Sequence, residues 1–526
     1  MVIDKYVLEL NSIKRKLNRY SDISFLLRMH QHLGTFRNKQ HGVILNLPWC
    51  CFLALKWKFS ANPVNNKEMS NREFVDIVNR VYRLQEYAIS FYKDKQIFLS
   101  MRRIMIPQML FQSGWKMDIN SLARQYIWFC QMDKEYYRAI FKKITGFSLD
   151  DFYKISSYLS VICYANDNSD SGSLHLNAIV IHLLPKFGLE TIFLYLKFVS
   201  LRFDEVRGFM QSHKYDDNRK SEYFEDTPLI SKPIILIDEK LIFLSKKILN
   251  VSLSNMIPNL LKAHHGTKFK EKFGKLMEKY VGDLLADLNV ELLTEDDIHR
   301  EYRKNNIKGK VVDFIIRYDN SSVFIDSKAI EPDKVIKTTD YAKTLKDRLK
   351  NSFTKGIIQG QECASKLSLL GYGNNLENDS LIIVTHKDHH IPTGKMIGDL
   401  IDEQLFDMIE TKYGEVKIKK ERIYYITVDD LEDLIYISKE KGITITEIIN
   451  KCVKDDSNKS GEKASFNMHI NSYFKSGIPD REDIIKHREY LINESIEYAR
   501  DANQVWDGLA NDYIPAYIQL RRQLGF

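Results

Sequence analysis

Cysteine is scarce in this chain of 526 residues, and its pattern argues against two kinds of site. The six cysteines form no CxxC pair and lie mostly in apolar segments: Cys50, Cys51, Cys130, Cys163, Cys363 and Cys452. Closely spaced cysteine pairs are typical of disulfide frameworks and structural zinc sites. Their absence predicts buried thiols in a reducing cytoplasm.

The sequence also lacks a nucleotide-binding loop, internal repeats and segments suited to cross a membrane. The sequence has no GxxxxGK[ST] loop and no internal repeat, so any nucleoside-triphosphate motor would be a separate protein. The most apolar stretches are 43–55, which is too short to cross a bilayer, and 176–203, which polar residues and a proline interrupt. Asp4 and Lys5 follow the first three residues, so we expect no signal peptide. We expect a cytoplasmic protein without membrane segments.

The composition and the polar stretches predict several domains. Hydrophobic residues make up 44%, charged residues 28%, and the net charge is +7, which is compatible with binding nucleic acid. Residues 1–225 follow helical periodicity and are predicted to form a mainly α-helical recognition or partner region that ends in the polar segment 216–226. The remainder divides into a hairpin-containing connector, an α/β domain and a helical C-terminal tail, at 226–261, 262–454 and 465–526.

The stretch from Lys310 to Glu331 places charges inside two apolar strands. Its two arms are rich in valine, isoleucine and phenylalanine, yet they contain Asp313, Asp326 and Lys328. Aspartate is depleted in strands, and a carboxylate on a buried sheet face is costly unless it is paired or bound to a metal. This hairpin is therefore the leading candidate for a functional site.

The register of this hairpin follows from its turn. If Asp319 and Asn320 form the loop, Tyr318 pairs with Ser321, and counting outward places Asp313 opposite Asp326. Side chains alternate between faces, so Lys328 lies on the face of Asp326. A divalent cation would turn the repulsion between the carboxylates into coordination. The alternative is a longer loop, with one aspartate in solvent and the other paired with Lys328.

The elements around the hairpin predict a small α/β domain. An amphipathic helix at 266–289 carries Glu278 beside its apolar stripe, and the alternating segment 298–304 is predicted to be a strand. After the hairpin come a long helix at about 339–370 and strands at 379–385 and 422–427. The predicted order is helix, three strands, helix, strand.

A helix with an inward glutamate, a strand aspartate and a returning strand that ends in Asp-x-Lys resembles the PD-(D/E)xK nuclease superfamily, the restriction-endonuclease-like fold. The resemblance covers about 262–454 and rests on Glu278, Val312-Asp313 and Asp326-Ser327-Lys328. Valine stands where the motif has proline, and the (D/E) position carries the shorter acid. The resemblance implies a central mixed sheet flanked by helices.

It also implies roles for single residues. Asp313 and Asp326 would ligate Mg²⁺, for which Mn²⁺ can substitute, with the Ser327 carbonyl as a third protein ligand. The metal would activate water for in-line attack on a phosphodiester. Lys328 would hold that water or offset phosphate charge, and Glu278 would orient a metal-bound water or a second ion. The alternative for Glu278 is an exposed carboxylate paired with a neighbouring lysine.

Basic residues follow the hairpin. Seven lysines or arginines but only two aspartates lie between positions 334 and 355, and Lys343, Lys346 and Lys350 share one helical face, spaced to meet a phosphate backbone. A solvated charged helix has the same pattern. In the superfamily this helix often carries a glutamine with a tyrosine four residues later, and here Gln359 and Gln361 occur without that tyrosine. Both are candidate nucleic-acid-binding residues.

Three histidines follow the strand at 379–385: His386, His389 and His390. The default interpretation is an exposed polar loop, and a zinc site is the alternative.

We therefore expect a cytoplasmic, Mg²⁺-dependent endonuclease that hydrolyses DNA. A large helical region fused to such a domain resembles prokaryotic restriction or antiphage-defence effectors, with a partner protein or a homo-oligomer formed through that region. One alternative is an RNA-cleaving effector of the same fold. Another is a non-catalytic nucleic-acid-binding or assembly module, for which three charges on one strand face would have no use.

Overall fold

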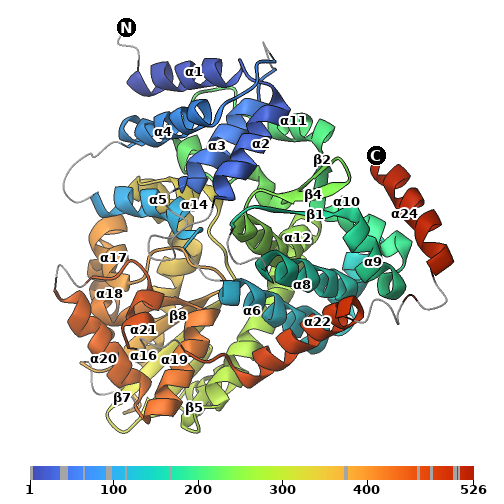
Figure 1. Ribbon diagram of the computed structural model, residues 1–526. Helices are drawn as coiled ribbons and strands as arrows, with labels where there is room; N and C mark the ends of the chain where they lie inside the picture. Colours follow the sequence, from blue (N-terminus) through green and yellow to red (C-terminus); the bar gives the residue numbers. More distant parts are fainter. Residues whose placement is uncertain are drawn as a thin grey trace. The chain divides into compact units, whose positions relative to one another are not determined.

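The computed structural model describes residues 4–35, 46–62, 66–89, 97–112, 115–165, 169–371, 377–458, 462–473, 478–500, 506 and 510–526. The chain is mostly helical and contains two small mixed β-sheets (Figure 1). It divides into two compact units. Unit 1 comprises Met1–Ser90, Pro107–Gly266 and Glu482–Phe526, and unit 2 comprises Phe91–Ile106 and Thr267–Arg481. Unit 2 is thus inserted in the sequence of unit 1.

Helices form most of unit 1. They include α1 (Lys5–Leu17), α2 (Asp22–Leu33), α3 (Pro48–Phe59), α4 (Asn71–Ala88), α6 (Trp115–Tyr126), α7 (Tyr136–Thr145), α8 (Leu149–Ala165), α9 (Leu176–Phe187), α10 (Leu189–Val199) and α11 (Phe203–Ser212). The sequence specifies the start of α4 by a capping box, in which Ser70 and Glu73 satisfy each other's backbone N–H groups. Phe74 and Ile77 begin its buried face. Among the helices that the structure describes, none is long and apolar enough to span a bilayer.

The sheet of unit 1 has the strand order β1-β4-β3-β2 (Gly172–His175, Lys240–Phe243, Ile234–Ile237, Ser200–Arg202). The hairpin predicted within 226–261 is confirmed, and its two turn residues, Asp238 and Glu239, both have positive φ. The hairpin pairs with β1 on one side and with β2 on the other. Residues 226–261 lie within unit 1.

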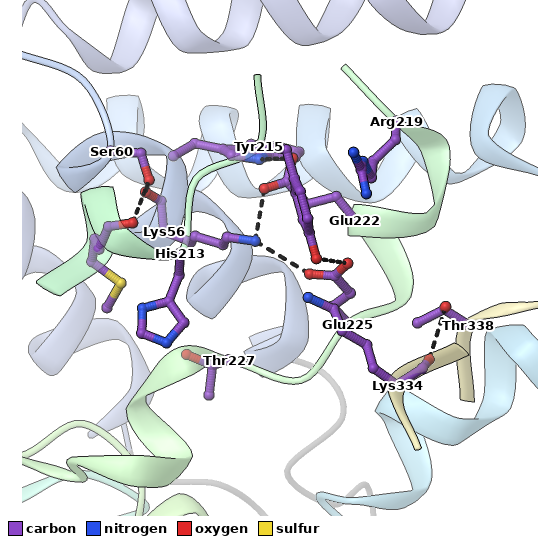
Figure 2. Close-up of polar contacts among 12 residues, drawn as sticks. Lys56, Ser60, His213, Tyr215, Arg219, Glu222, Glu225, Thr227, Lys334 and Thr338 are labelled. Atoms are coloured by element: carbon purple, nitrogen blue, oxygen red, sulfur yellow. Dashed lines mark hydrogen bonds and ion pairs between the residues drawn. The ribbon is translucent and has the colours of Figure 1, made fainter. Parts of the chain in front are cut away.

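The polar segment predicted as a boundary at 216–226 is also packed in unit 1 (Figure 2). Nζ of Lys56, on α3, lies 2.8 Å from Glu222 Oε1 and 3.3 Å from Glu225 Oε2. Trp57 Nε1–H donates to Glu222, and the Tyr215 hydroxyl donates to Glu225 at 2.7 Å. These buried contacts hold the 3-10 helix η4 (Lys220–Phe224) against α3.

The C-terminal residues return to unit 1. Helix α22 (Glu482–Arg500) packs against α6, α8 and α9, and α24 (Ala510–Leu524) packs against α9 and α10. Lys154 of α8 and Lys186 of α9 both pair with Glu494 of α22, at 3.0 and 2.9 Å. The helical tail predicted at 465–526 is thus divided, because α21 (Phe466–Tyr473) belongs to unit 2.

A five-stranded sheet is the centre of unit 2. Its order is β5-β6-β7-β8-β9 (Glu291–Thr294, Phe314–Tyr318, Ser321–Lys328, Ser380–Thr385, Ile423–Thr427). The first three strands form an antiparallel meander, whereas β8 runs parallel to β7 and β9 parallel to β8. The end of β5, the start of β6 and the ends of β7, β8 and β9 therefore lie at one edge of the sheet.

Helices pack against this sheet. Helix α12 (Lys246–Ala286) enters unit 2 at a kink at Gly266, and its Gly282 lies close to Phe314 of β6. The long predicted helix is observed as α15 (Ala342–Leu349), η6 (Lys350–Thr354) and α16 (Lys355–Ser368). Gly356 and Gly360 let α16 approach β8, because an added Cβ would come within 2.8 Å of Ile383 and 2.7 Å of Leu381. Helices α19 (Val428–Lys441) and α20 (Ile445–Asp456) follow β9.

The predicted strand at 298–304 is wrong. This segment belongs to helix α13 (Glu295–Lys304), and the first strand of the meander is β5, just before it. Thr294 and Asp297 form a capping box that starts the helix directly at the end of β5. The alternation of apolar residues in 298–304 also fits a short helix that buries only Ile298 and Tyr302.

A segment from the predicted recognition region belongs to unit 2. Residues 97–106, in α5 (Ile97–Met109), bring Arg102 into a buried position. Its guanidinium donates to the carbonyls of His389 at 2.7 Å, His390 at 3.0 Å and Ile336 at 2.9 Å. This arginine ties the loop after β8 to α14 (Lys334–Thr338), which follows β7.

Candidate functional site

The strand register brings the two predicted aspartates together. The predicted pairing of Tyr318 with Ser321 is confirmed, and it continues to Phe314 opposite Ile325. Asp313 directly precedes Phe314, and Asp326 directly follows Ile325, so both acids lie next to the last pair of this ladder. The Ser327 backbone N–H donates to Asp313 Oδ2 at 2.6 Å, so this carboxylate reaches across to β7.

Asp326 is fully buried and has one close cation. Lys328 Nζ lies 2.5 Å from Asp326 Oδ2. Among the described residues, no hydrogen-bond donor satisfies Asp326 Oδ1. Burial raises the pKa of Asp326 to about 7, and the nearby Asp313 adds to this rise while Lys328 opposes it. A buried carboxylate with an unsatisfied oxygen is a costly arrangement that a bound cation would relieve.

Glu278 and Asp313 have a third carboxylate neighbour, Glu295. One carboxylate oxygen from each of these residues lies within 4.8 Å of the other two. Burial raises the pKa of Glu278, as do the charges of Asp313 and Glu295, whereas Lys275 and Lys328 lower it. Glu278 is thus half-buried beside the site and is not a solvated helix carboxylate. Glu295 was not predicted from the sequence. The only local signal for its position is the capping box of Thr294 and Asp297, which starts α13 at Glu295, and this signal was overlooked.

The three lysines predicted to bind nucleic acid differ in their surroundings. Lys343 and Lys350 are exposed on α15 and at the start of η6. Lys346 Nζ lies 2.8 Å from Oδ1 of the buried Asp402. Lys343 and Lys350 are therefore accessible to a phosphate backbone, while Lys346 compensates a buried charge. Lys355, at the first turn of α16, acts on the charge of Asp326 and was not singled out from the sequence.

The two glutamines form hydrogen bonds to backbone groups of unit 2. Gln361 is buried, its Nε2–H donates to the Ile418 carbonyl at 2.5 Å, and its Oε1 accepts the Ile418 N–H at 3.1 Å. Gln359 donates to the Val311 carbonyl, two residues before Asp313. Because both ends of the Gln361 amide are occupied inside unit 2, we remove Gln361 from the nucleic-acid-binding set. Gln359 supports the backbone that leads into the site.

The histidines after β8 do not form the expected exposed loop. His386 and His389 are buried, and His386 Nδ1 lies 2.9 Å from Glu331 Oε1. His389 Nδ1 lies 3.0 Å from the Lys387 carbonyl oxygen. Burial lowers the pKa of both imidazoles, to about 4 for His389, which is therefore neutral at pH 7. Arg102 donates to the carbonyls of His389 and His390, so the end of this loop is also held through its backbone.

No protein-family model matches this chain, and no similar protein was found among curated sequences or solved structures.

Proposed function

We propose that unit 2 is a Mg²⁺-dependent endonuclease that hydrolyses phosphodiester bonds of DNA. The observation that carries the proposal is the convergence of Glu278, Asp313, Asp326 and Lys328 at one edge of the five-stranded sheet. Bringing three acids and a lysine this close together lowers the stability of the fold, unless the site binds a ligand that compensates their charges. They suit a centre that binds a cation and a phosphate.

The topology of unit 2 supports this proposal. A helix with Glu278 precedes an antiparallel meander, helices follow, and the next strand joins parallel to β7. This is the order that the resemblance to the PD-(D/E)xK superfamily implies. Asp313 directly precedes the second meander strand and Asp326 lies near the end of the third, which also supports the proposal.

The side chains present fit Mg²⁺. The available ligands are hard carboxylate oxygens, and the unsatisfied Asp326 Oδ1 is a buried acceptor that a cation would satisfy. Asp313 and Asp326 would hold the ion, with the Ser327 carbonyl as a further oxygen ligand. When bound, Mg²⁺ polarises a phosphate oxygen and lowers the pKa of a bound water.

The residues of the chain have separate tasks in this reaction. The Asp313 carboxylate is positioned by the hydrogen bond from the Ser327 N–H, and the Asp326 carboxylate by the ion pair with Lys328. Lys328, partly exposed, would offset the charge of the scissile phosphate or hold the attacking water. Glu278, whose pKa is raised by its surroundings, would accept a hydrogen bond from that water.

The proposal extends to the setting of the activity. Six reduced and buried cysteines suit the cytoplasm. The helical unit 1 would recognise a target, a partner protein or a trigger, as in the restriction and antiphage effectors that the sequence resembles.

A cleavage assay tests the proposal. The purified full-length chain is incubated with plasmid DNA or with RNA, in Mg²⁺, in Mn²⁺ or in EDTA. Asp326→Asn and Lys328→Ala are compared with Asp319→Asn, a matched control in the exposed turn of the same hairpin. We expect DNA cleavage that needs the metal, survives in the control and is lost in both site variants. Cleavage in EDTA, or by both site variants, would refute the site, and cleavage of RNA alone would favour the RNA-specific alternative.

A further inference from the structure

The helical turn just before Lys355 is fixed on the row of paired residues that contains Asp326. In the parallel ladders of β7 with β8 and of β8 with β9, Asp326 stands opposite Ile383, and Ile383 opposite Tyr425. Phe353, in the π-helical turn η6, stacks on Tyr425 with 3.9 Å between the ring centroids, and its carbonyl accepts the Tyr425 hydroxyl at 3.1 Å. The position of Lys355 along the sheet is therefore determined by this row.

Gly356 brings the start of α16 onto the Asp326 carboxylate. A Cβ at this glycine would lie 3.4 Å from Asp326 Oδ2 and 2.8 Å from Ile383, so the helix backbone passes close over the acid. Lys355 directly precedes this glycine and is exposed. Burial raises the pKa of Asp326, and the charge of Lys355 is among those that oppose this rise. An exposed cation thus stands beside the buried carboxylate that is proposed to hold the metal ion.

A second exposed lysine stands beside Glu278. Lys275 is three residues before Glu278 on α12, a spacing that makes the two side chains neighbours on the helix surface. Burial raises the pKa of Glu278, whereas the charge of Lys275 lowers it. Lys275 is therefore close to the acids of this edge, although it is not one of their ion-pair partners.

Lys275 and Lys355 come from helices on opposite faces of the sheet. Helix α12 approaches Phe314, which pairs with Ile325 in the antiparallel ladder. Ile325 and Asp326 follow each other in β7, so their side chains point to opposite faces. Because α12 packs on the face of Ile325 and α16 on the face of Asp326, the two helices flank the acidic edge.

Both lysines keep their charge available. Among the residues that the structure describes, the side chains of Lys275 and Lys355 form no ion pair and no hydrogen bond. Lys328, in contrast, is paired with Asp326 at 2.5 Å. The carboxylates of this edge repel a nucleic-acid backbone, so its approach is favoured by cations that are not already paired. Lys275 and Lys355 meet this condition on the two sides of the edge.

We propose that Lys275 and Lys355 bind nucleic-acid phosphates on the two sides of the metal site, so that the strand to be cut crosses the edge of the sheet between α12 and α16. Both lysines are assigned on the basis of the proposed function, whose substrate they would hold. Lysine ammonium groups are compact charges on flexible stems, and contacts to phosphate carry no base sequence. The ligand of these two residues is therefore a phosphodiester backbone of any sequence.

Binding without cleavage is the first test. The full-length wild type and the double variant Lys275→Gln, Lys355→Gln are titrated with fluorescent duplex DNA in EDTA, and anisotropy is followed at several salt concentrations. Each lost phosphate contact lowers the slope of log K against log salt by about 0.9, so we expect a slope smaller by about 1.8 and a loss of affinity on the order of tenfold or more at about 0.1 M salt. Lys439→Gln with Lys454→Gln is the charge-matched control on exposed positions of α19 and α20.

Cleavage in Mg²⁺ is the second test. The two lysines touch the substrate but not the metal, so we expect the double variant to raise KM about tenfold, with a smaller change in kcat. Lys275→Arg with Lys355→Arg keeps both charges and should restore most of the affinity. Thermal melting in EDTA verifies that each variant is folded.

The outcomes separate the phosphate contacts from the nuclease activity. Wild-type affinity and salt slope in the double Gln variant would overturn the contacts, as would an equal loss in the control pair. Binding that needs both lysines, without cleavage of any nucleic acid, would refute the activity and leave the contacts standing. Cleavage that depends on Asp326 and Lys328 but not on Lys275 and Lys355 would refute the contacts alone. A wild type that neither binds nor cleaves nucleic acid would overturn both.

Discussion

The backbone N–H of Ser327 donates a 2.6 Å hydrogen bond to Oδ2 of Asp313. This bond joins the residue before β6 to the penultimate residue of β7, outside the ladder of the two strands. It fixes the Asp313 carboxylate beside Asp326 even though Asp313 lies outside the strand. The geometry of the candidate site is therefore built into the backbone of the hairpin.

Replacing Asp326 should stabilise the metal-free protein at neutral pH. Burial raises the pKa of Asp326 from 3.8 to about 7, so the folded state binds more protons than the unfolded state between these values. The free energy of unfolding therefore falls as pH rises through this window, by on the order of a few kcal/mol. Asp326→Asn has no carboxyl to ionise at this position, so its free energy of unfolding should not show this decrease with pH.

Chemical denaturation in EDTA at pH 4.5 and pH 8 measures this effect. We expect Asp326→Asn to be more stable than the wild type at pH 8, with a difference that shrinks at pH 4.5, where the wild-type carboxyl is protonated. An equal difference at both pH values would contradict the assignment to this carboxyl. The exposed Asp319→Asn serves as the control and should leave the pH profile unchanged.

Removing the exposed lysines Lys343 and Lys350 should weaken nucleic-acid binding in a salt-dependent manner. If each contacts a phosphate, the double Gln variant lowers the slope of log K against log salt by about 1.8. Fluorescence anisotropy with a duplex in EDTA, at several salt concentrations, measures this slope. Lys439→Gln with Lys454→Gln, exposed on α19 and α20, is the charge-matched control. A slope that falls equally in both pairs would show a general charge effect.

Gln361→Leu should reduce stability without affecting nucleic-acid affinity directly. The substitution leaves the buried N–H and carbonyl of Ile418 without partners, which costs about 1–3 kcal/mol. Urea unfolding and anisotropy on the same protein separate the two effects. Gln359→Leu removes one hydrogen bond of a half-buried side chain and should cost less. A loss of affinity in fully folded Gln361→Leu would restore it to the binding set.

Arg102→Lys should loosen unit 2 despite the retained charge. A lysine ammonium cannot reproduce the planar fork that reaches the carbonyls of Ile336, His389 and His390, and the buried acceptors lose partners at a cost of about 2–4 kcal/mol. Hydrogen exchange should show reduced protection in 386–391 and in α14. Met101→Gln, exposed on the same helix, is the control. Unchanged protection in Arg102→Lys would show that the segment 386–391 does not depend on the hydrogen bonds of the guanidinium.

The hairpin at 310–331 could be predicted because its information is local. A two-residue loop fixes the register, and the register fixes which side chains oppose each other, as the pairing of Tyr318 with Ser321 shows. The helix carrying Glu278 was likewise predictable from its apolar stripe. Glu295 was not, because its nearness to Asp313 depends on the switch from strand to helix at Thr294.

Long-range packing explains the remaining differences. Residues 97–106 follow the helical pattern of their neighbours, and nothing in that pattern shows that Arg102 is buried among carbonyls more than 230 residues away in the sequence. The burial of His386 and His389 likewise depends on packing that the local sequence does not show. The role of Gln361 also depends on long-range packing, because its side-chain amide forms hydrogen bonds with the backbone of Ile418, 57 residues later in the sequence.

The insertion of unit 2 into the sequence of unit 1 has a consequence for synthesis on the ribosome. Residues 267–481 emerge before α22, which covers α6, α8 and α9 in the finished protein. The nascent chain thus has every segment of unit 2 while unit 1 still lacks its last helices. A chain released after residue 481 would contain every segment of unit 2 but would lack α22, which packs against α6, α8 and α9 of unit 1.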